Sequence, residues 1–164
     1  MISSSCVHRP CVTRIEFSGY LLTEFVRWGL AYKIHDDLHR IKMQFGQPIS
    51  ETIRDVPVPG EPELMNQIHV LTYYGLEMDV MHVNYIEPYD IIIGLRVTNN
   101  YHPMKFDIQI GDKKDRIEHL FGKGEEDGQA MTYSIEDPLC CDTVKFYFTD
   151  NNTLQMVKWD WQVD

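Results

Sequence analysis

The chain has 164 residues, of which 43% are apolar and 24% are charged, so it can fold around a hydrophobic core and is not a disordered polypeptide. Its formal net charge of −10 argues against nucleic acid and anionic membrane surfaces as partners, because both attract an excess of Lys and Arg. The charge fits a basic protein partner, although it would serve solubility equally well.

The sequence shows no targeting or membrane-spanning segment. No apolar run approaches the roughly 20 residues of a membrane span, and the start, from Met1 to Cys6, lacks the charged and apolar regions of a signal peptide. We expect a cytoplasmic protein, or a secreted one whose signal has been removed. The cysteines, Cys6, Cys11, Cys140 and Cys141, follow no disulfide framework. Reduced thiols fit them better than zinc, because Cys140 and Cys141 have no spacer between them.

The N-terminal extension, about residues 1–29, predicts a strand over 12–17 and a helix over 19–28. Ser18 is a suitable residue to cap this helix, and Gly29 is suited to end it. Apolar residues recur at helical spacing, which predicts an inward face of Leu21, Leu22, Phe25 and Val26.

An internal repeat is the strongest signal in the sequence. Residues 33–48 and 109–124 align without a gap, and six of the sixteen positions are identical. The identical pairs are Ile34/Ile110, Asp36/Asp112, Arg40/Arg116, Ile41/Ile117, Phe45/Phe121 and Gly46/Gly122. Such similarity indicates one structural unit used twice.

Each copy of the repeat predicts a short amphipathic helix. Asp36 and Asp112 are good N-cap residues, and Gly46 and Gly122 stand where a glycine commonly ends a helix. One helical face of each copy is apolar: Leu38, Ile41 and Phe45 in the first, and Ile117, Leu120 and Phe121 in the second.

Strand-like runs follow each predicted helix. The first copy has a polar, proline-rich connection over 47–67 and strands over 68–74, 76–83 and 91–98. The second has a connection over 123–129 and strands over 130–135, 143–149 and 154–161. We predict one α+β domain, 1–164, with tandem repeats at about 30–98 and 104–164. They form one continuous antiparallel sheet with helices on one face and an open, concave face.

The chain resembles the β-lactamase inhibitory protein fold. The likeness is carried by Ile-Gly-Asp of 110–112, Leu-Phe-Gly of 120–122 and the segments 148–150, 154–155 and 159–160. The resemblance covers about residues 30–161 and implies a concave, aromatic-rich sheet face that grips a protein. Inhibitors of this family carry a disulfide within each repeat, and no pair of cysteines in this chain could play that part. The implied likeness is therefore in the mode of binding rather than in β-lactamase inhibition.

The resemblance implies that Tyr147, with Lys145 beside it, lies on the gripping face. Glu77 and Asp79 share one face of a strand, where they could meet a basic partner or act as the paired carboxylates of a hydrolase. The predicted partner-binding residues are Tyr73, Tyr74, Glu77, Asp79, Tyr133, Lys145, Tyr147 and Trp159. Of these, Tyr73, Tyr74 and Trp159 could equally belong to the core, as could Trp161.

The sequence contains no nucleophile elbow, phosphate loop or dinucleotide fingerprint. His35 and His39 have the spacing of helical metal ligands, but no third ligand follows, and the second copy has Gly111 and Asp115 there. We predict no metal, no cofactor and no catalysis. The favoured function is an immunity or antitoxin-like protein that occludes a basic partner such as a toxin. The alternatives are an envelope-associated assembly module of the same fold and a metal-dependent enzyme.

Overall fold

The structure is a computed structural model that describes residues 17–84, 86–137 and 140–162. Its helices are α1 (Phe17–Arg27), α2 (Leu38–Phe45) and α3 (Lys114–Phe121), with a short 3-10 helix, η1 (Lys105–Asp107). The strands are β1 (Ser50–Val58), β2 (Glu61–Tyr73), β3 (Leu76–Val83), β4 (Tyr89–Val97), β5 (Glu125–Asp127), β6 (Ala130–Asp137), β7 (Cys140–Phe148) and β8 (Leu154–Asp160). The predicted α+β class is confirmed.

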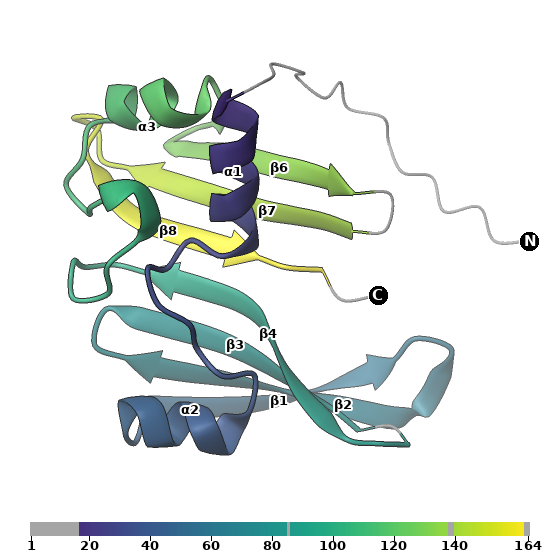
Figure 1. Cartoon of the computed structure of the whole chain (residues 1–164). Helices are drawn as coiled ribbons and strands as arrows, with labels where there is room; N and C mark the ends of the chain where they lie inside the picture. The colour runs from purple at the N-terminus through teal and green to yellow at the C-terminus, as the bar shows by residue number, and fades with distance from the viewer. Residues whose placement is uncertain (1–16, 85, 138–139, 163–164) are drawn as a thin grey trace, which may run out of the picture.

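All these strands form one antiparallel sheet in the order β1-β2-β3-β4-β8-β7-β6-β5 (Figure 1). Strands β4 and β8 join the two halves of the sheet, pairing from Gly94 with Asp160 to Val97 with Val157. Helix α2 precedes β1 to β4 along the chain, and α3 precedes β5 to β8. Each half of the sheet therefore consists of the four strands that follow one helix.

The helices cover one face of the sheet, in front of the strands in Figure 1. The ring centroids of Phe45 in α2 and Tyr73 in β2 lie 5.3 Å apart, and those of Phe121 in α3 and Tyr133 in β6 lie 5.8 Å apart. Helix α1 packs on β7 and β8 through Phe25, which is fully buried. No described helix packs on the opposite face, which we call the uncovered face.

Helix α1 begins earlier than the sequence predicted, so Ser18 lies within it rather than before it. Phe25 and Val26 are fully buried, as the apolar spacing predicted. Gly29 follows the helix and lies directly against the Trp159 ring, where an added Cβ would come within 2.1 Å of Cζ2. The strand predicted over 12–17 lies outside the described residues, except for Phe17, which is helical.

The predicted aspartate caps are each wrong by one residue. The N-cap of α2 is Asp37, whose Oδ1 accepts the backbone N–H of Arg40 at 2.8 Å. At α3 the N-cap is Lys113, which makes no side-chain cap, and the Asp112 carboxylate instead holds Arg116 at 2.7 Å. A carboxylate can bind a nearby arginine as readily as it accepts the free N–H groups at the start of a helix. The residue type alone therefore did not determine which residue is the N-cap.

The helix-ending glycines are confirmed. Gly46 and Gly122 are the C-cap residues of α2 and α3, and both have a φ of 80°. L-residues rarely adopt this φ, so the glycine is needed where the chain turns into the following strand.

The proline-rich connection predicted over 47–67 is instead a β-hairpin. β1 and β2 pair from Ser50 with Thr72 to Val58 with Glu61, and the turn between them includes Gly60 at a φ of 84°. Pro57 is tolerated because β1 is an edge strand, where one missing N–H need not break a ladder. The shorter connection likewise contains β5. Within the described residues, no helix is long and apolar enough to cross a membrane.

Candidate functional site

Three predicted binding residues, Tyr73, Tyr133 and Trp159, are in the core, so their placement on an exposed face was wrong. Their exposed fractions are 8%, 4% and 0%. Each lies under the helices and satisfies its polar atom there: Tyr73 Oη donates to the Gly46 carbonyl at 3.2 Å, and Tyr133 Oη to the Gly122 carbonyl at 2.6 Å. Burial raises the pKa of the Tyr133 hydroxyl. Strand alternation placed these rings on the covered face, where large rings fill the space beneath a helix.

Tyr74 lies beside the sheet's face rather than on it. It directly follows β2 and is 69% exposed, and its ring meets Tyr101 edge to face at 5.9 Å. Tyr101 was not predicted as a binding residue, because only the loop after β4 brings it to this corner. The pair is the most exposed aromatic contact among the described residues.

A buried histidine holds this corner in place. His102 is 5% exposed; its Nε2–H donates to the Tyr74 carbonyl at 2.9 Å and its Nδ1 accepts the Tyr32 hydroxyl at 2.6 Å. The Tyr74 carbonyl can only accept a hydrogen bond, so its bond to Nε2 places a proton on this nitrogen. Burial raises the pKa of Tyr32 to about 12, so this hydroxyl remains a donor at physiological pH.

The other predicted residues, Glu77, Asp79, Lys145 and Tyr147, are on the uncovered face. Along each strand they alternate with buried core residues such as Met78. They are only half-buried, since no helix packs over them. The structure thus brings four of the eight predicted binding residues onto one surface.

Strand pairing arranges the charges of the uncovered face in two rows. The first row crosses four strands, with each residue opposite the next. It runs from Glu77 on β3 through Arg96 on β4 and Lys158 on β8 to Lys145 on β7. In the second row, Asp79 of β3 lies opposite Gly94 of β4, which is opposite Asp160 of β8. The sequence did not single out Arg96, Gly94, Lys158 or Asp160, because only the pairing of β4 with β8 brings them beside the others.

Most of these charges are paired. Arg96 forms a short ion pair with Glu77, and Lys158 binds Asp160 at 2.8 Å. Asp79 is different: its carboxylate makes no hydrogen bond and no ion pair with the described residues. The centre of the uncovered face therefore contains one acid without a partner.

The surroundings of Asp79 disfavour its charge. Burial raises the pKa of this carboxyl, the nearby Glu77 raises it further, and Arg96, Lys158 and Arg54 oppose the change. The register of β3 and β4 shifts between Asp79 and Val80, a bulge of the kind that re-aims side chains. The carboxylate borders a shallow depression lined by Glu77, Asp79, Gly94, Leu95, Arg96 and Lys158.

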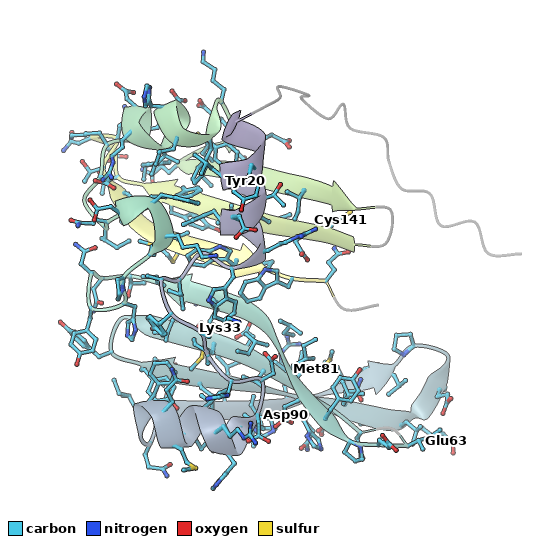
Figure 2. The ribbon with its side chains drawn as sticks, viewed as in Figure 1. Tyr20, Lys33, Glu63, Met81, Asp90 and Cys141 are labelled. Carbon is cyan, nitrogen blue, oxygen red and sulfur yellow. The ribbon has the colours of Figure 1, made fainter. Side chains whose placement is uncertain are left out.

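The two halves of the uncovered face differ in character. Beyond Asp79, the face of β2, β3 and β4 carries Ile68, Val70, Met81 and Ile91; Figure 2 labels Met81 near the point where these strands cross in the view. The corresponding face of β6 and β7 carries polar residues such as Thr132, with Lys145 and Tyr147. A mainly apolar region on β2, β3 and β4 and a polar region on β6 and β7 thus lie on either side of the charged centre.

The structure gives little support to the alternative of a metal-dependent enzyme. Helix α2 begins at Leu38, so His35 precedes it and does not share a helical face with His39. A group of three or more His, Cys, Asp or Glu side chains able to hold a metal ion does not occur in the part of the chain that the structure describes. Cys141 is an exposed free thiol.

Comparison with known proteins adds no family to this picture. No protein-family description matches the chain, and neither a curated protein nor a solved structure gives a significant match. The resemblance to the β-lactamase inhibitory protein fold stays a prediction.

Proposed function

We propose that this protein is a non-catalytic binding protein whose uncovered sheet face holds a basic protein partner. An immunity or antitoxin-like role, in which the face occludes a toxin, is the form of this function that we favour. The observation that carries the proposal is the continuous eight-stranded sheet that the described helices cover on one face only. A wide, uncovered sheet face with apolar and charged regions is a common type of protein interface.

We further propose that the two halves are diverged copies of one unit and that the uncovered face is concave. Two similar hydrogen bonds support the duplication. In each half, a tyrosine of the second strand donates to the carbonyl of the glycine that ends the helix, Tyr73 to Gly46 and Tyr133 to Gly122. Ile68 supports the concavity, because it is only 5% exposed on a face that no described helix covers.

The charge of the chain supports a basic partner. The chain carries 25 acidic and 15 basic side chains, and a partner of opposite charge would associate faster and more selectively. At the centre of the uncovered face, only Asp79 is left without an ion pair among the described carboxylates of the two rows. The negative net charge would therefore attract a basic partner, and the uncovered face would offer it one unpaired acid, Asp79.

The experiment is a binding measurement with purified basic proteins, starting with toxin nucleases encoded beside this gene. The variant Asp79→Ala/Tyr147→Ala removes an acid and a tyrosine from the uncovered face. The control Asp36→Ala/Tyr20→Ala removes the same residue types from exposed positions outside the sheet. We expect the first variant to bind about tenfold more weakly, or about 1.4 kcal/mol, and the control to bind normally.

Two results would count against the proposal. If none of the adjacent toxins binds, the immunity role is wrong. If both double variants weaken binding equally, the partner does not use the uncovered face.

A further inference from the structure

We propose that the arm formed by the joined ends of β1 and β2, residues 56–65, docks against a basic surface of the partner, where lysines and arginines surround apolar side chains. This inference rests on the proposed function, because it names a contact that the basic partner makes. Three features of the described residues carry it: an arm that no other element covers, exposed apolar side chains, and charges that are acidic only.

The arm is only two strands wide. β3 pairs with β2 from Gln67 to Tyr73, so the arm lies beyond the third strand of the sheet. In Figure 1 the joined ends of β1 and β2 reach past the other strands at the right of the view. At the base of the arm, Asn66 Oδ1 accepts the backbone N–H of Asn84 at 3.0 Å. An isolated two-stranded hairpin is at best marginally stable in water, so a surface that covers the arm would stabilise it.

Helix α2 leaves the arm uncovered. Its first residue, Leu38, donates its backbone N–H to Asp90 at 2.9 Å, and its last residue, Phe45, packs on Tyr73 at the far end of β2. Asp90 lies in the same row of the sheet as Gln67, next to the base of the arm. The helix therefore runs away from the arm, and no described helix packs on the opposite face.

The arm carries apolar side chains on both of its faces. Met65, which pairs with Pro57, is 45% exposed on the side that α2 does not reach. Val56 and Leu64 alternate with them and continue the apolar region of the uncovered face that includes Ile68. An apolar centre within a polar rim is the usual make-up of a protein interface.

The charges around the arm are acidic only. Residues 55–95 include seven Asp and Glu but no Lys or Arg, although the chain averages about one Lys or Arg in every eleven residues. Glu61 and Glu63 on the arm, and Glu87 in the turn after β3, are exposed and form no ion pair with the described residues. Figure 2 labels Glu63 on the arm. These acids are therefore available to a partner.

The charges also decide which occupant fits the arm. Arg54, the nearest base along the chain, acts on Asp79 at the centre of the uncovered face. Two arms from two copies of this chain would bring unpaired acids together, so like charges oppose a dimer through the arm. A basic surface would pair with these acids and cover the apolar side chains between them.

A peptide experiment tests the arm without the natural partner. The probe is acetyl-Lys-Val-Lys-Leu-Lys-amide; one twin has glutamate in place of each lysine, and the other has glycine in place of valine and leucine. Each is titrated into the isotope-labelled full-length protein at low salt, and backbone amide shifts are followed by NMR. We expect the probe to shift the amides of residues 56–65, Asn84 and Glu87, the glutamate twin to leave them unchanged, and the glycine twin to bind more weakly.

A first pair of variants tests the acids. Glu61→Gln/Glu63→Gln should weaken binding of the probe by about threefold to tenfold, the range of two exposed ion pairs. The control Asp36→Asn/Asp127→Asn removes the same charge from exposed positions away from the arm. It should weaken binding by less than about twofold, because only the long-range attraction is reduced.

A second pair of variants tests the apolar contact. Met65→Gln should weaken binding of the probe by about twofold to threefold, because glutamine has a similar size but a more polar side chain. The control Met43→Gln changes a methionine of α2 that is 73% exposed, and it should have no effect.

Several outcomes would overturn the arm as the docking site. These are shifts spread over the whole acidic surface, equal binding of the probe and either twin, equal losses in a variant and its control, or no shift at all. Arm amides that shift with protein concentration alone would make a second copy the occupant and would also overturn the proposal. The comparison of the peptides uses the unaltered protein, so it remains decisive if a variant folds poorly.

The experiment separates this inference from the proposed function. If the probe binds the arm but no basic protein binds the chain, the proposed function fails while the arm remains a binding surface. If a basic protein binds the uncovered face and the arm amides respond neither to it nor to the probe, the function stands and the docking role of the arm is wrong.

Discussion

The indole of Trp159 on β8 donates its Nε1–H to the carbonyl of Phe25 in α1 at 2.9 Å, which joins residues 134 positions apart. The same ring lies against Gly29, so the chain passes directly beside the indole as it leaves α1. This contact anchors the N-terminal helix to the central strands of the sheet, with the ring of Trp159 fully buried.

Gly29→Ala should therefore destabilise the protein by about 1–3 kcal/mol, because the added methyl overlaps the Trp159 ring and forces the ring or the backbone to move. Gly19→Ala is the matched control within α1, where no atom lies within 4 Å of the new Cβ. This change should stabilise the helix by up to about 1 kcal/mol. Thermal or urea unfolding of both variants measures the difference, and equal stabilities would contradict the packing.

Tyr133→Phe should cost about 1 kcal/mol, because it removes the 2.6 Å hydrogen bond to the Gly122 carbonyl and leaves that carbonyl without this donor. Tyr73→Phe should cost less, because its bond to Gly46 is longer, at 3.2 Å. Urea unfolding gives both free energies. A smaller loss for Tyr133→Phe than for Tyr73→Phe would contradict this ranking.

Asp79→Asn should stabilise the protein at neutral pH. The pKa of the Asp79 carboxyl is raised in the folded state. Its contribution to the free energy of unfolding is therefore favourable below the ordinary carboxyl pKa, near 4. This contribution is lost as the pH rises through the folded-state pKa. Asparagine does not titrate, so its advantage should be present at pH 7 and vanish toward pH 3. Solvent screening keeps the gain below about 1 kcal/mol. Unfolding curves across this pH range check the sign.

Glu51→Gln should have the opposite pH dependence. Hydrogen bonds from Lys42 at 2.7 Å and His69 at 2.9 Å lower the pKa of Glu51, which connects α2, β1 and β2. Its stabilising contribution is present above the ordinary carboxyl pKa and is lost as the pH falls through the lowered value. The variant should therefore be slightly less stable at neutral pH, by under about 1 kcal/mol, and equally stable in strong acid. A loss that persists in strong acid would contradict the ionic origin.

The sequence by itself determined the local elements. Apolar spacing identified the buried faces of all three helices, the glycines at 46 and 122 marked the ends of α2 and α3, and alternation gave most of the strands. These features depend on residues close together in the chain, where periodicity and backbone freedom act directly. The hairpin of β1 and β2 was missed because its prolines and acids are typical of a loop until an edge strand accommodates them.

Only the tertiary structure decided which face of each strand would be covered. Tyr73, Tyr133 and Trp159 became core residues because helices pack over their side of the sheet, while Lys145 and Tyr147 stayed on the other side. Alternation separates a strand's two faces but does not say which of them a distant helix will bury. The pairing of β4 with β8 likewise placed Gly94 between Asp79 and Asp160, a neighbourhood that depends on contacts between segments far apart in the chain.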